Sequence, residues 1–147
     1  MILFVSVCVK SLIELGRRYE WPKGQVCPRC GGRLWGHGFV SGWFDGCSHA
    51  VWLPRYRCSI CRKAVRVRPE GYWSRFQASI AEVRESLAHR LKCGRWPSGR
   101  SPSRQRHWLN GLKKQIQARF GMGWEGDLMQ AFDELCKAGI RAASRAV

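Results

Sequence analysis

Four cysteines in the sequence are arranged as two Cys-x-x-Cys pairs. The first pair is Cys27 and Cys30, the second is Cys58 and Cys61, and 27 residues separate them. Structural zinc takes four soft ligands in a tetrahedron, and one Cys-x-x-Cys turn supplies two of them. The separation between the two pairs is longer than is typical of such sites, which is about 15–20 residues. Added loop length costs little entropy, however. The pattern predicts one structural Zn²⁺ ion, with no open coordination position for a substrate.

Other uses of these thiols fit the sequence less well. A redox-active dithiol is typically a single Cys-x-x-Cys pair beside a βαβ pattern. Disulfides need an oxidising compartment, and the apolar segment 1–9 lacks the basic start and the cleavage site of a signal peptide. We therefore expect a cytoplasmic protein without a membrane-spanning segment. The other four cysteines are expected to be small buried residues: Cys8, Cys47, Cys93 and Cys136.

Positive charge is concentrated in the middle of the chain. The formal net charge is +16, and residues 55–119 contain seventeen Lys and Arg but only three acidic residues. A block of one sign indicates an anionic partner. Nucleic acid is the first candidate, ahead of an anionic membrane.

Two groups of residues are candidate nucleic-acid ligands. Near the second cysteine pair, basic residues are mostly two apart, so a strand would place several on one face along a phosphate backbone. Around the start of the helix predicted from near Ser103, the serine cap and the positive end of the helix dipole could attract phosphate. The basic helix could enter the major groove, where Arg reads guanine and Gln or Asn reads adenine. The first group is Arg55, Arg57, Arg62, Lys63, Arg66 and Arg68, and the second is Arg100, Arg104, Gln105, Arg106, Asn110, Lys113 and Lys114.

The elements that must position these residues follow from hydrophobic spacing. Strands are predicted at 2–9, 33–40, 50–58 and 64–69, with Pro54 on an edge strand. A short helix between Ser11 and Gly16, a helix over 74–92 that stops at Gly94, a helix from near Ser103 and a helix from about Asp127 complete the set. The predicted fold is α+β: a lead-in at 1–24, a small antiparallel zinc ribbon at 25–70, and a basic, helix-turn-helix-like part at 71–147.

A catalytic site is not indicated. His37, His49 and Asp45 lie between the cysteine pairs, as in some metal nucleases, but those sites also need an Asn after the His, and Asn110 is far from them in sequence. The His-x-Glu of a zinc deaminase is missing ahead of the first cysteine pair. The chain is therefore expected not to be an enzyme, with a metal-dependent nuclease as a remaining alternative.

The cysteine region resembles the zinc-ribbon segment of bacterial insertion-sequence transposases and related transposon-encoded small proteins. The matching residues are the Cys-Pro-x-Cys-Gly run at 27–31, His37-Gly38, and the Arg-Tyr-Arg-Cys run at 55–58 with Cys61. The segment 101–115 looks like the helix-turn-helix that often follows. The resemblance covers about residues 25–115 and implies a DNA-binding module of a mobile element, without the catalytic domain of those transposases.

These observations together predict a non-catalytic, zinc-dependent protein that binds duplex DNA ahead of RNA, as an accessory or regulator. A transposase or another protein subunit is a further expected partner. The alternative from another class is a structural or adaptor subunit of a nucleoprotein complex that binds protein through its tryptophan-rich ribbon. In that ribbon Trp35, Trp43, Trp52 and Tyr56 either pack the sheet or stack on unpaired bases.

Overall fold

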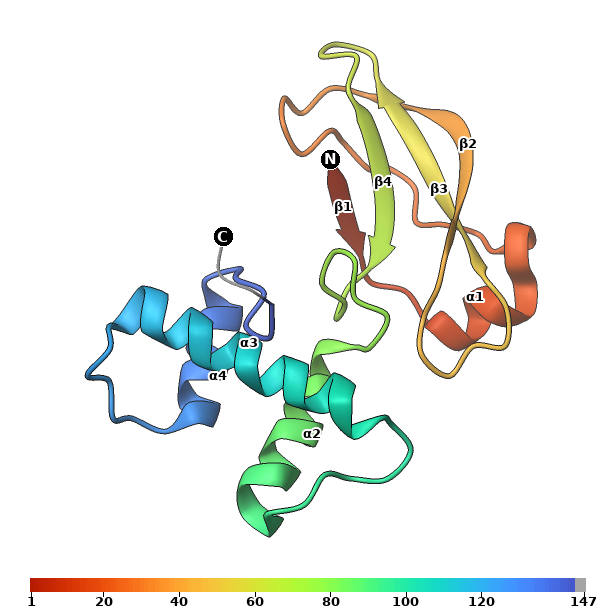
Figure 1. Cartoon of the computed structure of the whole chain (residues 1–147). Helices are drawn as coiled ribbons and strands as arrows, with labels where there is room; N and C mark the ends of the chain where they lie inside the picture. Colours follow the sequence, from red (N-terminus) through yellow and green to blue (C-terminus); the bar gives the residue numbers. More distant parts are fainter. Residues whose placement is uncertain (145–147) are drawn as a thin grey trace. The chain divides into compact units, whose positions relative to one another are not determined.

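The computed structural model describes residues 1–144, and the chain forms two compact units, Met1–Ser79 and Ile80–Val147 (Figure 1). The first unit is built on a four-stranded sheet, and the second contains three helices in its described part. The α+β class is therefore confirmed. None of the helices in residues 1–144 is long and apolar enough to cross a lipid bilayer.

The sheet has the strand order β1-β4-β3-β2 (Figure 1). Its strands are β1 (Ile2–Val5), β2 (Leu34–Gly42), β3 (Val51–Cys58) and β4 (Ala64–Pro69). Strands β2, β3 and β4 form an antiparallel meander, as the sequence predicted, while β1 pairs with β4 in parallel. The first strand therefore belongs to the same sheet as the cysteine pairs.

Two local predictions in this unit are wrong. Pro54 lies in an interior strand, because β3 pairs with both β2 and β4. The ladder between β3 and β4 stops at Arg55, so the proline, which has no N–H to donate, lies just outside it. Helix α1 (Val9–Leu15) begins after Cys8 and not at Ser11, although it does end at Gly16, as predicted.

The core of the sheet unit includes two small clusters. Leu12 of α1 packs with Phe44, Val51 and Leu53 in one of them. The other surrounds Val65 and includes Cys27 and Cys58, one from each Cys-x-x-Cys turn. We call these two turns the knuckles. A unit of this size buries little apolar surface, so a bound metal would contribute much of its folding free energy.

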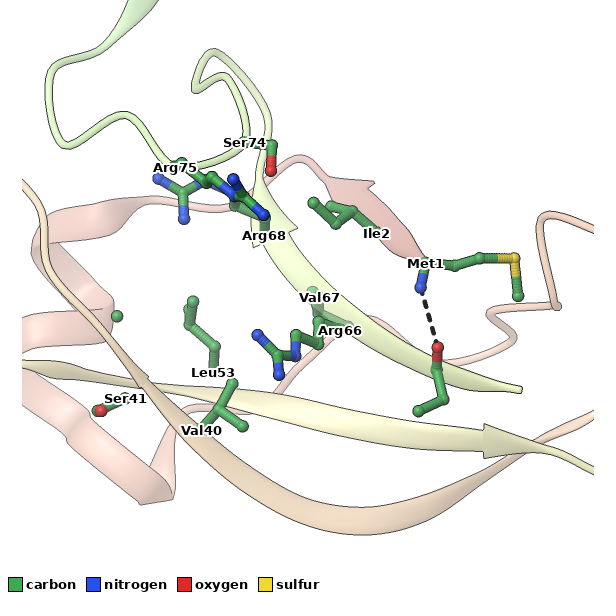
Figure 2. A pocket seen from close by; sticks show the side chains of 12 residues that line it. Met1, Ile2, Val40, Ser41, Leu53, Arg66, Val67, Arg68, Ser74 and Arg75 are labelled. Carbon is green, nitrogen blue, oxygen red and sulfur yellow. Dashed lines mark hydrogen bonds between the residues drawn. The ribbon is translucent and has the colours of Figure 1, made fainter. Parts of the chain in front are cut away.

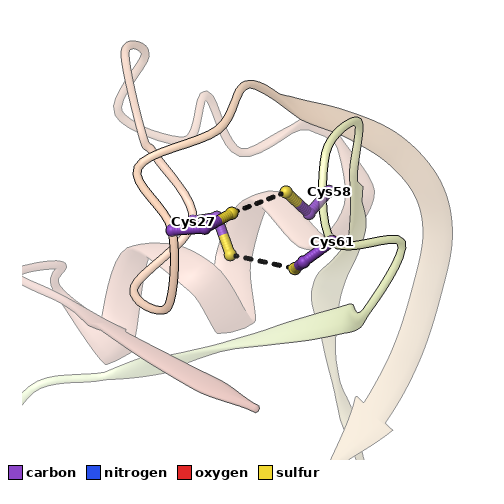
Figure 3. Close-up of side chains that lie close together, drawn as sticks. Cys27, Cys58 and Cys61 are labelled. Atoms are coloured by element: carbon purple, nitrogen blue, oxygen red, sulfur yellow. Dashed lines mark hydrogen bonds between the residues drawn. The ribbon is translucent and has the colours of Figure 1, made fainter.

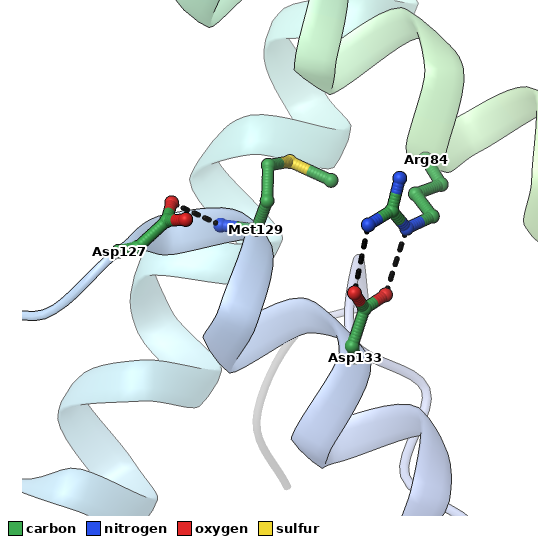
Figure 4. Close-up of polar contacts among 4 residues, drawn as sticks. All are labelled: Arg84, Asp127, Met129 and Asp133. Atoms are coloured by element: carbon green, nitrogen blue, oxygen red, sulfur yellow. Dashed lines mark hydrogen bonds and ion pairs between the residues drawn. The ribbon is translucent and has the colours of Figure 1, made fainter.

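The helical unit contains α2 (Ile80–Cys93), α3 (Pro102–Phe120) and α4 (Leu128–Lys137). Its buried side chains recur at helical spacing on facing sides of the three helices: Val83, Leu87, Trp108, Leu112, Ile116, Phe132 and Leu135. Arg84 of α2 donates two hydrogen bonds of 2.7 Å to Asp133 of α4, and Asp127 caps α4 by accepting a hydrogen bond from the Met129 N–H (Figure 4). The predicted start of α4 is confirmed.

The start of α2 and the capping residue of α3 differ from the prediction, whereas α3 does start near Ser103. Helix α2 begins at Ile80 and not at residue 74, because the segment before it is held by the sheet unit. There the carbonyl of Gln77 accepts a hydrogen bond from the N–H of Asp45, 32 residues earlier. Helix α3 begins after Ser101, whose hydroxyl accepts from the Arg104 N–H, so Ser103 is not its cap.

Candidate metal centre and basic surfaces

Each Cys-x-x-Cys pair lies in a tight turn, and the two turns share one hydrogen-bonding pattern. The Cys27 N–H donates to the Gly32 carbonyl at 2.9 Å, and the Cys58 N–H donates to the Lys63 carbonyl at 3.1 Å. In both turns the acceptor lies five residues after the donor. The two knuckles are therefore built alike, although one precedes β2 and the other joins β3 to β4.

Both knuckles also need one residue in the left-handed region, directly after the second cysteine. Gly31 has φ 69° in the first knuckle, and Arg62 has φ 58° in the second. Glycine takes this conformation at no steric cost, whereas an arginine is strained there by about 1–2 kcal/mol. The second turn therefore has the same backbone geometry as the first, although this geometry strains its arginine.

The four sulfurs converge on one point between the knuckles (Figure 3). All four Sγ atoms lie within 4.8 Å of one another, with 3.7 Å between Cys27 and Cys61 and 3.5 Å between Cys30 and Cys58. Sulfurs at the corners of a tetrahedral zinc site, with Zn–S of about 2.3 Å, are about 3.8 Å apart. The cysteines are free rather than disulfide-bonded. The predicted clustering is confirmed, and the donor set fits a tetrahedral thiolate metal site.

The surroundings of the sulfurs favour a thiolate at Cys58 and a protonated thiol at Cys61. Burial raises the pKa of Cys58, but hydrogen bonds from the N–H groups of Cys61 and Ile60 and from neighbouring thiols outweigh it and lower the pKa to about 6. For Cys61 a hydrogen bond from Lys63 lowers the pKa, yet burial and the other three thiols together raise it to about 11. The cluster thus carries negative charge that a metal dication would neutralise while displacing the remaining protons.

The other four cysteines are less buried than predicted. Cys8 and Cys93 are exposed, and Cys47 and Cys136 are partly buried. Within residues 1–144 the knuckle cysteines form the one group of three or more Cys, His, Asp or Glu side chains close enough for a single metal ion. The residues of the alternative nuclease site, including His49, whose ring nitrogen bonds to Ser48, are not part of such a group.

Four arginines of the first predicted group share one face of the sheet. Arg55 lies directly opposite Arg66 across the β3–β4 ladder, and Arg57 lies opposite Ala64 on the same face. Arg68 follows Arg66 by two residues in β4 and so points to the same side. The expectation that the alternating spacing brings these side chains to one face is confirmed. We call these four residues the arginine face.

The arginine face is held in place by main-chain carbonyls. The Arg55 Nε–H donates to the His37 carbonyl at 3.0 Å, and the Arg57 Nε–H donates to the Arg62 carbonyl at 3.3 Å. Each bond leaves other guanidinium N–H groups available for a ligand. Arg62 and Lys63, the remaining members of the first group, lie exposed in the second knuckle and not on a strand.

Helix α3 presents a polar stripe opposite its buried side. The exposed residues of this stripe recur every three or four positions and include four of the predicted ligands. They are Ser103, Arg106, His107, Asn110, Lys113, Lys114 and Gln117. No Asp or Glu occurs in α3. We call this set the α3 stripe; His107 and Gln117 are members that the sequence interpretation missed, although their spacing from Asn110 and Lys114 would have revealed them.

Three predicted ligands of the second group lie elsewhere. Gln105 is fully buried, and its amide accepts from the Ser86 hydroxyl at 2.5 Å and donates to the carbonyls of Pro97 and Arg100. The Arg100 side chain forms an ion pair of 2.5 Å with Glu82. Arg104 stacks on Trp108, with 5.2 Å from its guanidinium carbon to the ring centroid. Gln105 therefore packs the helical unit, and we leave it out of the surface proposed below.

Arginine–tryptophan pairs cover part of the sheet unit, and the sequence did not reveal them. Arg33 lies over Trp35 at 4.6 Å, and Arg17 lies over Trp52 at 4.2 Å. Trp35 and Trp43 are each 54% exposed, so about half of the surface of these two side chains is accessible to solvent. Since Arg17 and Trp52 are far apart in the chain, no local pattern could have indicated their contact.

Comparison of the chain with protein-family models, with curated proteins and with solved structures finds no match. The resemblance to transposase zinc ribbons therefore stays a prediction that rests on the residues named for it.

Proposed function

We propose that this chain is a zinc-dependent, non-catalytic protein that binds nucleic acid, with duplex DNA preferred over RNA. The observation that carries the proposal is the α3 stripe, where Arg106, Asn110, Lys113 and Lys114 are exposed together on a helix without acidic residues. Such a face complements the phosphate backbone.

The major groove admits one α-helix, and α3, at 19 residues, is long enough to follow it. Arg106 and Asn110 lie one turn apart near the middle of the stripe, where their forked side chains can contact base edges. Lys113 and Lys114 lie one turn further on and suit phosphate contacts. Base contacts supply specificity and phosphate contacts supply position.

Zinc is the metal we propose for the four-cysteine cluster. Four cysteine sulfurs within 4.8 Å of one another suit a closed structural zinc site, and such a site leaves no position for a substrate. Its proposed role is to hold the two knuckles, and with them the β3–β4 turn that leads into the arginine face. Removal of the metal should therefore loosen this unit.

The resemblance of residues 25–115 leads us to propose a role as a cytoplasmic accessory or regulator of a mobile element, with a transposase or another protein subunit as partner. A second candidate function, an adaptor in a nucleoprotein complex, is favoured by one observation: large apolar side chains are exposed in the sheet unit. They are Trp35, Trp43 and Ile60, the last at 68% exposure.

The decisive experiment compares two triple variants in DNA binding. The first variant removes the basic residues of the α3 stripe, Arg106→Ala, Lys113→Ala and Lys114→Ala. The matched control replaces three exposed basic residues of the sheet unit by alanine, Lys10, Arg18 and Lys23, so that both variants have the same net charge. Electrophoretic mobility shifts are measured with duplex DNA, single-stranded DNA and RNA at two or more salt concentrations.

We expect the α3 variant to bind duplex DNA at least about tenfold more weakly. Its salt slope should be smaller by about 0.9 for each phosphate that the substituted side chains no longer neutralise. The control should keep most of its affinity. Equal weakening in both variants would refute a specific role of α3. Unchanged binding in the α3 variant would refute it too and would favour the adaptor. Preferred binding of RNA would correct the proposed ligand.

A further inference from the structure

An unexplained feature of the sheet unit is a pocket of about 500 Å³ along β4. Figure 2 shows the guanidinium groups of Arg66, Arg68 and Arg75 around it, with the Ser74 hydroxyl near the last two. Val40 and Leu53 line it on the opposite side. No Asp or Glu lines the pocket in the described part of the chain. Three cations thus line one concave site that has no acidic side chain in its described lining.

Arg68 is the one of the three cations that has a buried donor without a partner. Its guanidinium is half-buried, lies 5.1 Å from the centre of the Phe44 ring, and donates one hydrogen bond to the Phe76 carbonyl. Its Nε–H is buried and has no hydrogen-bond partner in the structure. Burial lowers the pKa of this arginine, and the nearby Tyr72 opposes that effect only in part. A buried guanidinium with an unused donor is costly unless an anion binds it.

The other two arginines also lie in unfavourable positions, one because of charge repulsion and the other because of its backbone conformation. Arg66 lies directly opposite Arg55 on the neighbouring strand, and like charges in this position repel each other. Arg75 has φ 67°, a left-handed conformation that is strained for any residue with a side chain. Neither forms an ion pair within residues 1–144. An anion in the pocket would relieve the repulsion and would make use of all three side chains.

We propose that this pocket binds a phosphate monoester. Guanidinium forks match phosphate oxygens in a bidentate manner. An internal phosphodiester carries one negative charge, whereas a monoester carries about −1.5 to −2 at neutral pH, which suits three arginines better. The apolar wall formed by Val40 and Leu53 offers a surface for the organic part of the ligand. The source is either the terminal phosphate of a nucleic-acid strand or a free nucleotide.

This proposal is independent of the α3 stripe, since all residues that line the pocket belong to residues 1–79. Failure of either proposal therefore leaves the other standing. It goes beyond general affinity for a polyanion, because it assigns the chemical end group that the pocket selects.

The test uses the full-length protein loaded with Zn²⁺ and two single substitutions, Arg75→Gly and Arg62→Gly. Both replace a left-handed arginine by glycine, so both remove one charge and the same kind of backbone strain, but only Arg75 lines the pocket. The probes are adenosine 5′-monophosphate against adenosine, and a six-nucleotide single strand with a 5′-phosphate against the same strand with a 5′-hydroxyl. Titration calorimetry measures the affinities, and a thermal melt checks that each variant is folded.

In the wild type and in Arg62→Gly, we expect the phosphate to strengthen binding by about tenfold or more, whereas Arg75→Gly should lose most of that gain. Arg66→Gln, at an exposed position of β4, should lose it as well. If the gain occurs with the mononucleotide alone, the site stands and its ligand is a free nucleotide; if it occurs with the strand, the ligand is a strand end. The proposal is overturned if the phosphate adds nothing to either probe, or if the two glycine variants lose the phosphate-dependent gain equally.

Discussion

Gly32 provides the sharpest test of the metal centre. It is the buried residue whose carbonyl closes the first knuckle. A Cβ added there would lie 2.9 Å from the Sγ of Cys58 and 3.0 Å from the side chain of Ile60. Ile60 is mostly exposed and can rotate away, but Cys58 cannot once a metal holds its sulfur. The substitution Gly32→Ala therefore acts on the metal-bound state above all.

The expected magnitude follows from the cost of overpacking a tight site, which is about 1–3 kcal/mol. At about 1.4 kcal/mol per tenfold, this corresponds to zinc affinity reduced by about 5–150-fold. The matched control is Gly36→Ala in β2, where a Cβ would have no atom within 4 Å and where φ is not positive. Both changes stiffen the unfolded chain alike, so that contribution cancels between the two variants.

Zinc affinity is measured by competition with a chromogenic chelator, and the same titration is repeated with Co²⁺, whose absorption reports tetrahedral thiolate coordination. We expect Gly36→Ala to bind like the wild type and Gly32→Ala to bind more weakly. Equal zinc affinity of Gly32→Ala and the wild type would mean that Cys58 does not hold the metal where the structure places its sulfur. The reasoning about the tetrahedral site would then be refuted.

Three further outcomes test the helical unit and the remaining thiols. Gly111→Ala places a Cβ 2.4 Å from a main-chain oxygen after α4, so the melting temperature of the helical unit, followed by circular dichroism, should fall; an unchanged value would contradict this packing. Ser86→Ala leaves the buried amide oxygen of Gln105 without its donor and should lower the free energy of unfolding in urea by about 1–3 kcal/mol, with DNA affinity of the folded protein unaltered. Iodoacetamide at pH 8 should modify Cys8 before Cys136, as followed by mass spectrometry. Hydrogen bonds from a nearby serine lower the pKa of the exposed Cys8 thiol, whereas burial raises the pKa of Cys136 to about 11. The reverse order of modification would contradict this reasoning.

Local sequence patterns predicted the cluster of four cysteines and most of the elements. The Cys-x-x-Cys spacing is itself a turn-forming unit, so the knuckles could be predicted without tertiary information. The alternation of Arg55, Arg57 and Arg66 follows the two-residue period of a strand and placed them correctly on one face. Helices α3 and α4 were recognised because their apolar residues recur at helical spacing.

Predictions that depended on distant partners could not be made from the sequence. Gln105 and Asn110 both lie in α3 and have similar chemistry, but the Ser86 hydroxyl and two main-chain carbonyls bury the first, while the second stays exposed. Likewise, residues 74–79 have helical spacing and yet form no helix, because hydrogen bonds to the sheet unit compete with those of a helical turn.

The sequence by itself determined which residues could hold a metal and which helix face is basic, since both depend on spacings of a few residues. Only the tertiary structure decided that β1 joins β4 in parallel, that the four sulfurs lie within 4.8 Å of one another, and that Arg75 joins Arg66 and Arg68 around one pocket. Each of these depends on hydrogen bonds and packing between segments far apart in the chain, whose free energy no local pattern encodes.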